Sequence, residues 1–481
     1  MSDQFSATGS DAAPCSAFNA YLHAIWEAAG GDSAYLRHLT VTGHGALPSV
    51  FCVTDLAAAS IGAASLAIAA LVSSRADMFP VVEVDRRLAS FWFQGSLHPE
   101  GWPMPPTWDG IAGDYQAIDG WIRLHTNAPH HRDAALAVLK TSIDRKAVAH
   151  AVAQWNAVEL ESAILLNGGC AASMRTLAEW NDHPQGRAVA TEPLLHRKTF
   201  GGAKVPPWSP TIDRPLRGLK VLDLTRILAG PIATRFLAAF GAEVLRIDPY
   251  GWEEPITVPE VVLGKRCARL DLKTPDGRRM FETLLAQADI FIHGYRPDAL
   301  ARLGVEASRR RSLNPGLIDV CLDAYGWTGP WSSRRGFDSL IQMSTGIADA
   351  GMRAMGRNRP TPLPVQAIDH ATGYLMATAA ILGLTERIKT GAGCEIRASL
   401  ARTARLLTST DGQSSDAPPL LAETPDDLSA EIEQTGWGPA RRTRPPVQIA
   451  GVPMYWELPA SKLGSSPASW ASTDSSPRKN G

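Results

Sequence analysis

The stretch Leu216-Arg-Gly-Leu-Lys-Val-Leu-Asp-Leu224 begins a series of short apolar segments in the second half of the chain. Three more segments of this kind cover residues 244–247, 290–292 and 317–322. Such near-continuous runs of aliphatic residues are typical of strands buried on both faces of a parallel sheet. Amphipathic stretches such as residues 276–288 lie between them. This alternation predicts an α/β region in which helices join parallel strands.

The turn after the first predicted strand argues against the common dinucleotide enzymes. It reads Arg226-Ile-Leu-Ala-Gly-Pro231 and lacks the G-x-G-x-x-G spacing that carries a dinucleotide pyrophosphate. Asp248 ends the second strand, where such an enzyme binds a ribose, but without the glycines this position carries little weight. The sequence also lacks a P-loop, an H-E-x-x-H motif and a G-x-S-x-G elbow. We therefore expect no NAD, FAD or other cofactor and no metal.

Composition is that of a metabolic enzyme. The 481 residues include 47 basic and 48 acidic side chains, and a net charge of -1 argues against nucleic acid or an anionic membrane as the main partner. We identify no apolar run with the length and charge-free character of a membrane span, and no secretory signal, so we expect a cytoplasmic protein. The cysteines are far apart and are expected to be reduced; they are Cys15, Cys52, Cys170, Cys267, Cys321 and Cys394.

One carboxylate stands just ahead of a long run of small and apolar residues. Asp369 lies in Leu363-Pro-Val-Gln-Ala-Ile-Asp-His-Ala-Thr-Gly373, and residues 374–384 are expected to form a buried helix. A carboxylate at this point is desolvated, while the helix N-terminus favours its ionised form. That environment suits a nucleophile that attacks an activated carbonyl and is then regenerated. Taken alone, Asp369 is better explained as a simple helix N-cap, and it is the surrounding motifs that favour a nucleophile.

Further motifs follow the first strand in a fixed order. They are Gly264-Lys-Arg266, Leu270-Asp-Leu-Lys-Thr-Pro-Asp-Gly277, Ile290-Phe-Ile-His-Gly-Tyr-Arg-Pro297, Tyr325-Gly-Trp-Thr-Gly-Pro330, Arg335-Gly-Phe-Asp338 and Thr390-Gly-Ala-Gly393. In this order and spacing, residues 215–405 resemble the family III CoA-transferases, the group of formyl-CoA transferase and carnitine CoA-transferase. The resemblance implies an α/β fold with a six-stranded, nucleotide-type (Rossmann-like) parallel-sheet domain and a smaller α/β domain. It places Asp369 on the family's catalytic aspartate.

The resemblance also implies contacts with the adenine and phosphates of CoA. It assigns them to Lys273, Arg296 and Arg302. The 3′-phosphate and pyrophosphate of CoA need cations and backbone donors, which agrees with this assignment. For each basic residue the alternative is a solvated surface charge. CoA is expected as a substrate and not as a resident cofactor.

The thioester end of CoA is expected near the turn that follows the first strand. Leu228 and Ala229 belong to that turn, and Gly230 allows close approach of the backbone. Arg335 and Phe337 are expected to line the same pocket. One departure from the family is Pro249, which stands where formyl-CoA transferase has an arginine, so we expect one CoA contact to be missing.

Two segments of the chain resemble each other. Residues 48–71, which contain Asp55, parallel residues 362–384, and a strand-like piece follows each segment. Residues 115–184 resemble the smaller domain of the same transferases, so the domain order is expected to be reversed. The predicted units are 1–204 with a catalytic-helix-like segment and the small domain, a Pro-rich linker at 205–215, the nucleotide-type domain at 216–409, and 410–481 as a flexible segment and closing tail.

Other regions carry weaker expectations. Residues 410–435 are expected to be flexible, 436–465 to pack back on the core, and 466–481 to be disordered. Residues 95–113 occupy the place of the family's glycine-rich lid without matching it. Asp55 is read as a relic or structural cap, with a second nucleophile as the alternative.

The expected activity is transfer of CoA from an acyl-CoA donor to a carboxylic acid through an aspartyl anhydride and thioester, in a homodimer. An α-methylacyl-CoA racemase is the first alternative, but its catalytic histidine is replaced here by Phe337, and His370 is the nearest substitute. A non-catalytic CoA-binding subunit is the second alternative. Neither the donor nor the acceptor acid can be read from the residues.

Overall fold

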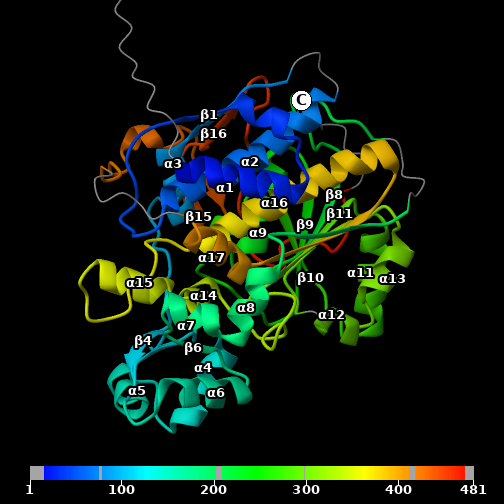
Figure 1. Cartoon of the computed structure of the whole chain (residues 1–481). Coiled ribbons are helices and arrows are strands. Elements are labelled where there is room, and N and C mark those ends of the chain that lie inside the picture. Colours follow the sequence, from blue (N-terminus) through cyan, green and yellow to red (C-terminus); the bar gives the residue numbers. More distant parts are fainter. Residues whose placement is uncertain (1–15, 75–78, 202–207, 297, 411–417, 472–481) are drawn as a thin grey trace, which may run out of the picture.

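The computed structural model describes residues 16–74, 79–201, 208–296, 298–410 and 418–471. Within them, a seven-stranded sheet has the order β10-β9-β8-β11-β12-β13-β7 (Figure 1). Its strands are β7 (His196–Thr199), β8 (Lys220–Leu224), β9 (Glu243–Asp248), β10 (Lys265–Arg269), β11 (Ile290–His293), β12 (Ile318–Asp323) and β13 (Cys394–Ser399). Every neighbouring pair from β10 to β13 is parallel, which confirms the predicted parallel sheet.

Both faces of this sheet are buried. Successive residues of β8 belong to different clusters, since Val221 packs on the side of α9 (Ala229–Ala239) and Leu222 packs with Phe281 of α11 (Pro275–Ala286). This two-sided burial is the physical reason for the continuous apolar runs in the sequence. Shorter helices complete the α11 side and the ends of the strands: α10 (Val258–Val261), α12 (Ala299–Arg302) and α13 (Ala307–Leu313).

The predicted catalytic helix is α16 (Ala367–Thr390), and it is almost wholly buried. It packs on α9 and on α2 (Val53–Ser73), which in turn packs on α1 (Ser16–Ala29). Figure 1 shows α1 and α2 beside α16, although they lie far apart in the sequence. The N-terminal segment is therefore part of the same core as the nucleotide-type sheet.

The internal repeat is present in the backbone. The unit β1 (Leu39–Thr42), α2, β2 (Val82–Asp85) and α3 (Arg86–Gln94) corresponds to β12, α16, β13 and α17 (Leu400–Thr408). Both long helices start with the same tight turn, because the N–H of Val53 donates to the Phe51 carbonyl at 2.8 Å and that of Ala367 to the Val365 carbonyl at 2.8 Å. In each copy a third strand joins antiparallel: β7 on β13, and β16 (Val447–Ile449) on β2. The similarity of the two segments is therefore structural.

A smaller α/β unit lies below the main sheet in Figure 1. Its sheet consists of β4 (Gly113–Gln116), β5 (Trp121–Leu124) and β6 (Ala171–Ser173). The helices of this part of the chain are α4 (Pro129–Leu139), α5 (Arg145–Val152), α6 (Ala157–Leu166), α7 (Leu177–Asp182) and α8 (Pro184–Thr191). From the nucleotide-type half, α14 (Asp338–Ser344) and α15 (Ile347–Ala354) reach toward it, with α14 packed on β5 and β6.

The tail packs back on the core, as predicted for residues 436–465. Trp456 stacks on Trp92 with ring centroids 5.5 Å apart, and the N–H of Gly264 donates to the Leu458 carbonyl at 2.9 Å. The tail also supplies β14 (Glu433–Thr435) and β15 (Gly438–Arg442). These two strands pair with each other, and β15 also pairs with β3 (Leu97–Pro99).

Two expectations of disorder were too broad. Residues 418–435 include the short helix η2 (Pro425–Asp427), where Asp427 pairs with Arg87 at 2.6 Å. The Trp470 indole donates to the Leu284 carbonyl at 3.2 Å, so the chain is anchored beyond residue 466. Residues 411–417, 472–481 and the linker positions 205–207 lie outside the described residues. The proposed domain boundaries stay a prediction.

One helix among the described residues, α2, is long and apolar enough to cross a membrane, and it is almost wholly buried inside the fold. The sequence analysis identified no apolar run with both the length and the charge-free character of a membrane span; α2 has the length, and it carries a single charge, Asp55, near its start. Its burial against α1 and α16 is that of a core helix. The described cysteines are buried, whereas Cys15 lies outside the described residues. The remaining short element, η1 (Ser33–His38), follows α1.

Candidate active site

A cavity of about 360 Å³ opens at the carboxyl ends of β8, β11 and β12. Open parallel sheets bind their ligands at this edge, where the loops after the strands meet. Six of the eight residues predicted for the site line this cavity: Leu228, Ala229, Arg296, Arg335, Phe337 and Asp369. They come from four separate parts of the second half of the chain, so the fold brings them together.

The other two predicted residues do not line the cavity. Lys273 is exposed after β10, and its backbone N–H donates to the Asp271 carboxylate at 2.9 Å. Arg302 forms an ion pair with Asp298 on the same helix, and its side chain is 59% exposed. Both are placed as solvated surface charges, so their assignment to CoA rests on the family resemblance alone.

Asp369 lies in the first turn of α16 and is only 7% exposed. Burial raises its pKa well above the usual range, and the neighbouring Asp338 carboxyl raises it further. The sequence led us to expect that the helix N-terminus would favour the ionised form. That expectation is wrong, because desolvation and a second carboxyl outweigh the helix dipole.

Asp338 connects Asp369 to α14. The backbone N–H of Asp369 donates to Asp338 Oδ2 at 2.9 Å, and the Gln342 amide donates to Asp338 Oδ1. Gln342 in turn accepts the N–H of Leu363 at 2.6 Å. These bonds hold the segment before α16 against α14. Burial raises the pKa of Asp338 to about 6, although the donated hydrogen bonds favour its ionised form.

Four guanidinium groups line the cavity. Arg334 pairs with Glu161 at 2.7 Å, and the other three are Arg226, Arg296 and Arg335. Arg226 donates to the Tyr295 hydroxyl at 2.8 Å and lies 4.4 Å from the Trp252 ring centroid. Arg335 donates to the Gly168 carbonyl at 2.9 Å. Across the described residues, no carboxylate lies within ion-pair distance of these three groups, and this leaves their charge for an anionic ligand. Arg226 was missed because a single arginine in a turn carries no sequence signal.

The N-terminal half also contributes to the cavity wall. His130 and His131 line it from α4, and His131 Nε2 lies 3.5 Å from Cys170 Sγ. Burial lowers the pKa of His131 to about 4, so this imidazole is neutral near pH 7. Phe337, which lines the cavity, stacks on His125 behind it, with ring centroids 3.8 Å apart. The sequence analysis missed both wall histidines, since they precede Asp369 by nearly half the chain.

A second carboxyl of the wall, Asp323, stands at the end of β12. Its Oδ1 accepts the N–H groups of Tyr325 at 2.8 Å and Gly326 at 2.9 Å. Burial raises its pKa to about 8 despite these bonds. Near neutral pH it is therefore mainly a hydrogen-bond donor toward the cavity.

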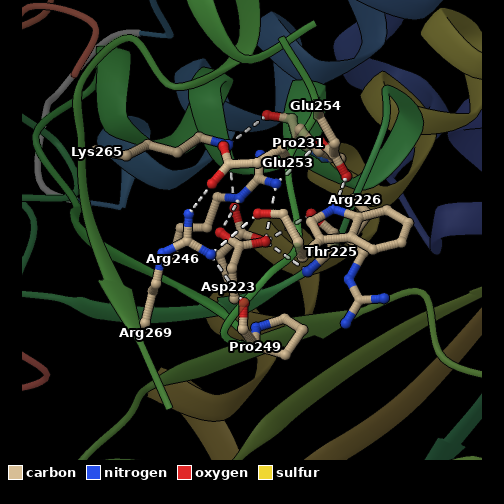
Figure 2. Close-up of polar contacts among 12 residues, drawn as sticks. Asp223, Thr225, Arg226, Pro231, Arg246, Pro249, Glu253, Glu254, Lys265 and Arg269 are labelled. Carbon is tan, nitrogen blue, oxygen red and sulfur yellow. Dashed lines mark hydrogen bonds and ion pairs between the residues drawn. The ribbon is translucent and has the colours of Figure 1, made fainter. Parts of the chain in front are cut away.

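The turn after β8 is held in a strained conformation. Ile227 has φ of 66°, a left-handed conformation that β-branched residues avoid, and its N–H donates to Glu254 at 3.1 Å. Glu254 also pairs with Arg246 at 2.9 Å. Figure 2 shows Glu254 and Arg246 close to Asp223 and Lys265, and the last two residues pair at 3.0 Å. This buried charge network holds the turn that carries Arg226.

Pro249 occupies the position where the family comparison suggested a lost arginine. Arg269 of β10 reaches this point, because its guanidinium donates to the Pro249 carbonyl at 2.9 Å and to the Trp252 carbonyl at 3.0 Å (Figure 2). It also pairs with Glu253. A cation is therefore present beside Pro249, but it comes from another strand and does not line the cavity.

Three other expectations concern residues outside the cavity wall. The segment 95–113 packs on the smaller unit, where Trp108 lies 4.7 Å from the Arg123 guanidinium. His370 stacks on Phe93 with centroids 4.8 Å apart, so it is not placed to replace the racemase histidine. Asp55 pairs with Arg86 at 3.0 Å. Arg86 is the first residue of α3, and the corresponding first residue of α17 in the other copy is Leu400, which lines the cavity.

Comparison with known proteins finds matches for the second half of the chain. Residues 216–418 match CoA-transferase family III. "Probable fatty acyl-CoA transferase Rv3272" of Mycobacterium tuberculosis is 31% identical over 192 residues, which cover 37% of this chain and 48% of the relative. Human "Succinyl-CoA:glutarate CoA-transferase" is 33% identical over 202 residues, covering 39% of this chain and 45% of the relative.

The match is partial in both sequence and structure. The chain spans about half the length of the curated relatives it matches. The crystal structure of a CAIB/BAIF family protein from Brucella suis aligns with 47% of this chain and 65% of that chain, at 26% identity and a TM-score of 0.38. The similarity to this family is therefore a similarity of sequence over residues 216–418.

Proposed function

We propose that this protein moves CoA from an acyl-CoA donor to a carboxylic acid, and the match of residues 216–418 to CoA-transferase family III supports this proposal. One observation carries the proposal: Asp369 lines a cavity in which three arginines, Arg226, Arg296 and Arg335, have no carboxylate partner among the described residues. A nucleophile and an anion-binding surface are the two features that acyl-CoA chemistry requires. Arg226, Arg296 and Arg335 are the proposed contacts for the CoA phosphates.

The proposed reaction starts with the ionised Asp369 attacking the thioester carbonyl. The C–S bond breaks, sulfur leaves with the electron pair as CoA thiolate, and a mixed anhydride forms. The thiolate then attacks the Asp369 carbonyl, which releases the donor acid and leaves an aspartyl-CoA thioester. The acceptor carboxylate repeats these steps in reverse order, so that CoA moves to the acceptor and the Asp369 carboxylate is restored. An anhydride conserves the activation of the thioester, whereas hydrolysis would lose it.

The backbone at the start of α9 has a role in the proposed reaction. Ala229 and Gly230 line the cavity at the start of that helix, where N–H groups are free of intrahelical partners. Such donors stabilise the oxyanion of a tetrahedral intermediate. The buried charge network beneath the turn keeps this segment in place, so that the donors are ordered before substrate enters.

Trapping of the covalent intermediate tests the proposal. Succinyl-CoA is the first donor to try, because it is named for the human relative. Intact-protein mass spectrometry after incubation with succinyl-CoA and hydroxylamine should show a modification at one site per chain. Asp369→Asn should abolish it.

The repeat supplies a matched control for this experiment. Asp55→Asn changes the same residue type at the same position of the duplicated helix, and it should leave the modification intact. CoA binding without any modification, across a panel of acyl-CoAs, would favour the non-catalytic reading. Exchange of the substrate α-proton with solvent would favour the racemase.

The remaining expectations about the whole protein are proposals as well. We propose a cytoplasmic homodimer that needs no cofactor, on composition and on the family resemblance. Light scattering that shows a fully active monomer would contradict the dimer.

A further inference from the structure

Two buried carboxyls meet at the first turn of α16. Asp338 is 1% exposed and Asp369 is 7% exposed. They come from the starts of two different helices and are joined by the bond from the Asp369 N–H to Asp338 Oδ2, at 2.9 Å. Two neighbouring carboxyls with so little solvent cannot both ionise cheaply, so their titrations are linked.

The two carboxyl groups receive unequal numbers of hydrogen bonds from the described residues. Asp338 accepts the Gln342 amide and the Asp369 N–H, and both bonds favour its ionised form. The Asp369 side chain has no hydrogen-bond donor among the described residues. The negative charge therefore belongs on Asp338 and the proton on Asp369.

The surrounding groups do not reverse this assignment. Arg123 of β5 favours the charge on Asp338, since it lowers the pKa of that carboxyl. Burial lowers the pKa of the three nearby histidines, to about 3 for His125 and His370 and about 4 for His131, so all three are neutral near pH 7. Asp323 lines the same cavity and, with a pKa raised by burial to about 8, adds little negative charge at that pH.

We propose that Asp338 is a positioning residue that controls the charge of the nucleophile: it anchors the backbone of Asp369 and keeps the Asp369 side chain protonated until the proton is lost through the cavity. The inference rests on the proposed function. Deprotonation releases the Asp369 proton to water and leaves the carboxylate that attacks the thioester. The reaction should therefore show an acidic limb at a higher pH than an ordinary aspartate would give.

The test is the pH dependence of intermediate formation in Asp338→Asn. An asparagine can still accept the Asp369 N–H through its amide oxygen, but it removes the negative charge. Ionisation of Asp369 then becomes easier, so the acidic limb of the trapping rate with succinyl-CoA should move to lower pH by about one unit or more. The rate on the high-pH plateau should change only a few-fold.

Two further variants keep the test decisive. Asp349→Asn is the matched control, because Asp349 is also a buried aspartate in the first turn of a helix but pairs with Arg353 at 2.8 Å, away from the cavity. Its acidic limb should coincide with that of the wild type. If Asp338→Asn does not fold, Gln342→Met removes one donor from Asp338 and should shift the limb in the same direction by a smaller amount.

The outcomes separate this inference from the proposed function. An intermediate that forms in Asp338→Asn with an unmoved limb and a lower plateau would show a purely structural role and overturn the inference. A limb that moves to higher pH would overturn it as well. Absence of an intermediate in the wild type at every pH would overturn the proposed function, and this inference with it.

Discussion

Gly373→Ala probes the contact between the catalytic helix and the turn that carries the cavity wall. Gly373 lies in α16 where it crosses α9. A Cβ added there would lie 2.4 Å from the Ala229 carbonyl oxygen and 2.9 Å from Ile232 Cβ. The nearest atom belongs to the backbone, so no side-chain rotation relieves the clash.

The expected size of the effect follows from two opposing terms. Replacing glycine with alanine inside a helix stabilises it by about 1 kcal/mol. Overpacking a close contact costs about 1–3 kcal/mol, and a backbone obstacle places this case at the upper end. We expect a net loss of about 2 kcal/mol in the free energy of unfolding. Displacement of Ala229 should also weaken CoA binding about tenfold, which corresponds to about 1.4 kcal/mol.

Urea unfolding and calorimetric titration with CoA measure the two quantities. Gly383→Ala is the control in the same helix, where the added Cβ meets Cys394 Sγ at 3.0 Å and Ile318 Cγ2 at 3.4 Å. Both neighbours are side-chain atoms, so the control should stay within about 1 kcal/mol of the wild type. If Gly373→Ala is as stable as the wild type and binds CoA equally well, the argued contact between α16 and the turn is refuted.

Two further predictions concern charge. Arg226→Gln should weaken CoA binding about tenfold, since hydrogen bonds to charged groups contribute about 1.5–3 kcal/mol, whereas Arg302→Gln should stay within about twofold; a tenfold loss for Arg302→Gln would instead support the contact implied by the family. Glu260 is buried, which raises its pKa, but Arg235 and Arg442 outweigh this effect and lower the pKa to about 2. Its folded-state pKa lies below the unfolded one, so its stabilisation, of about 3 kcal/mol, is present above the unfolded value and is lost as the pH falls toward 2. Urea unfolding should therefore show Glu260→Gln far less stable than the wild type at pH 7 and closer to it near pH 3, and an equal gap at both pH values would contradict the assignment.

Much of the nucleotide-type half could be predicted because its signals are local. The apolar runs around Val221 and Ile290 identify strands buried on both faces, and the observed strands contain them. The family resemblance predicted a common site for Asp369, Arg296 and Phe337, and the structure brings all three to one cavity. The same resemblance assigned Lys273 and Arg302 to CoA, but their side chains are exposed and do not line this cavity.

What the sequence missed depends on contacts between distant segments. Strand β7 joins the sheet antiparallel from the N-terminal half, and His130 and His131 reach the cavity from the smaller unit. Histidines in an amphipathic helix give no sign of the partner they face. The position of Asp55 in a repeat was visible in the sequence, but only the packed structure shows that Arg86 pairs with it.

The sequence by itself determined the parallel strands, the repeated helix and the identity of the candidate nucleophile, since hydrophobic periodicity and residue order are properties of neighbouring residues. Only the tertiary structure decided the charge of that nucleophile. The helix N-terminus predicted an ionised Asp369, but the packed neighbours remove its water and place Asp338 beside it. Desolvation and the proximity of a second carboxyl exist only after distant segments have packed together, and here they outweigh the local field of the helix.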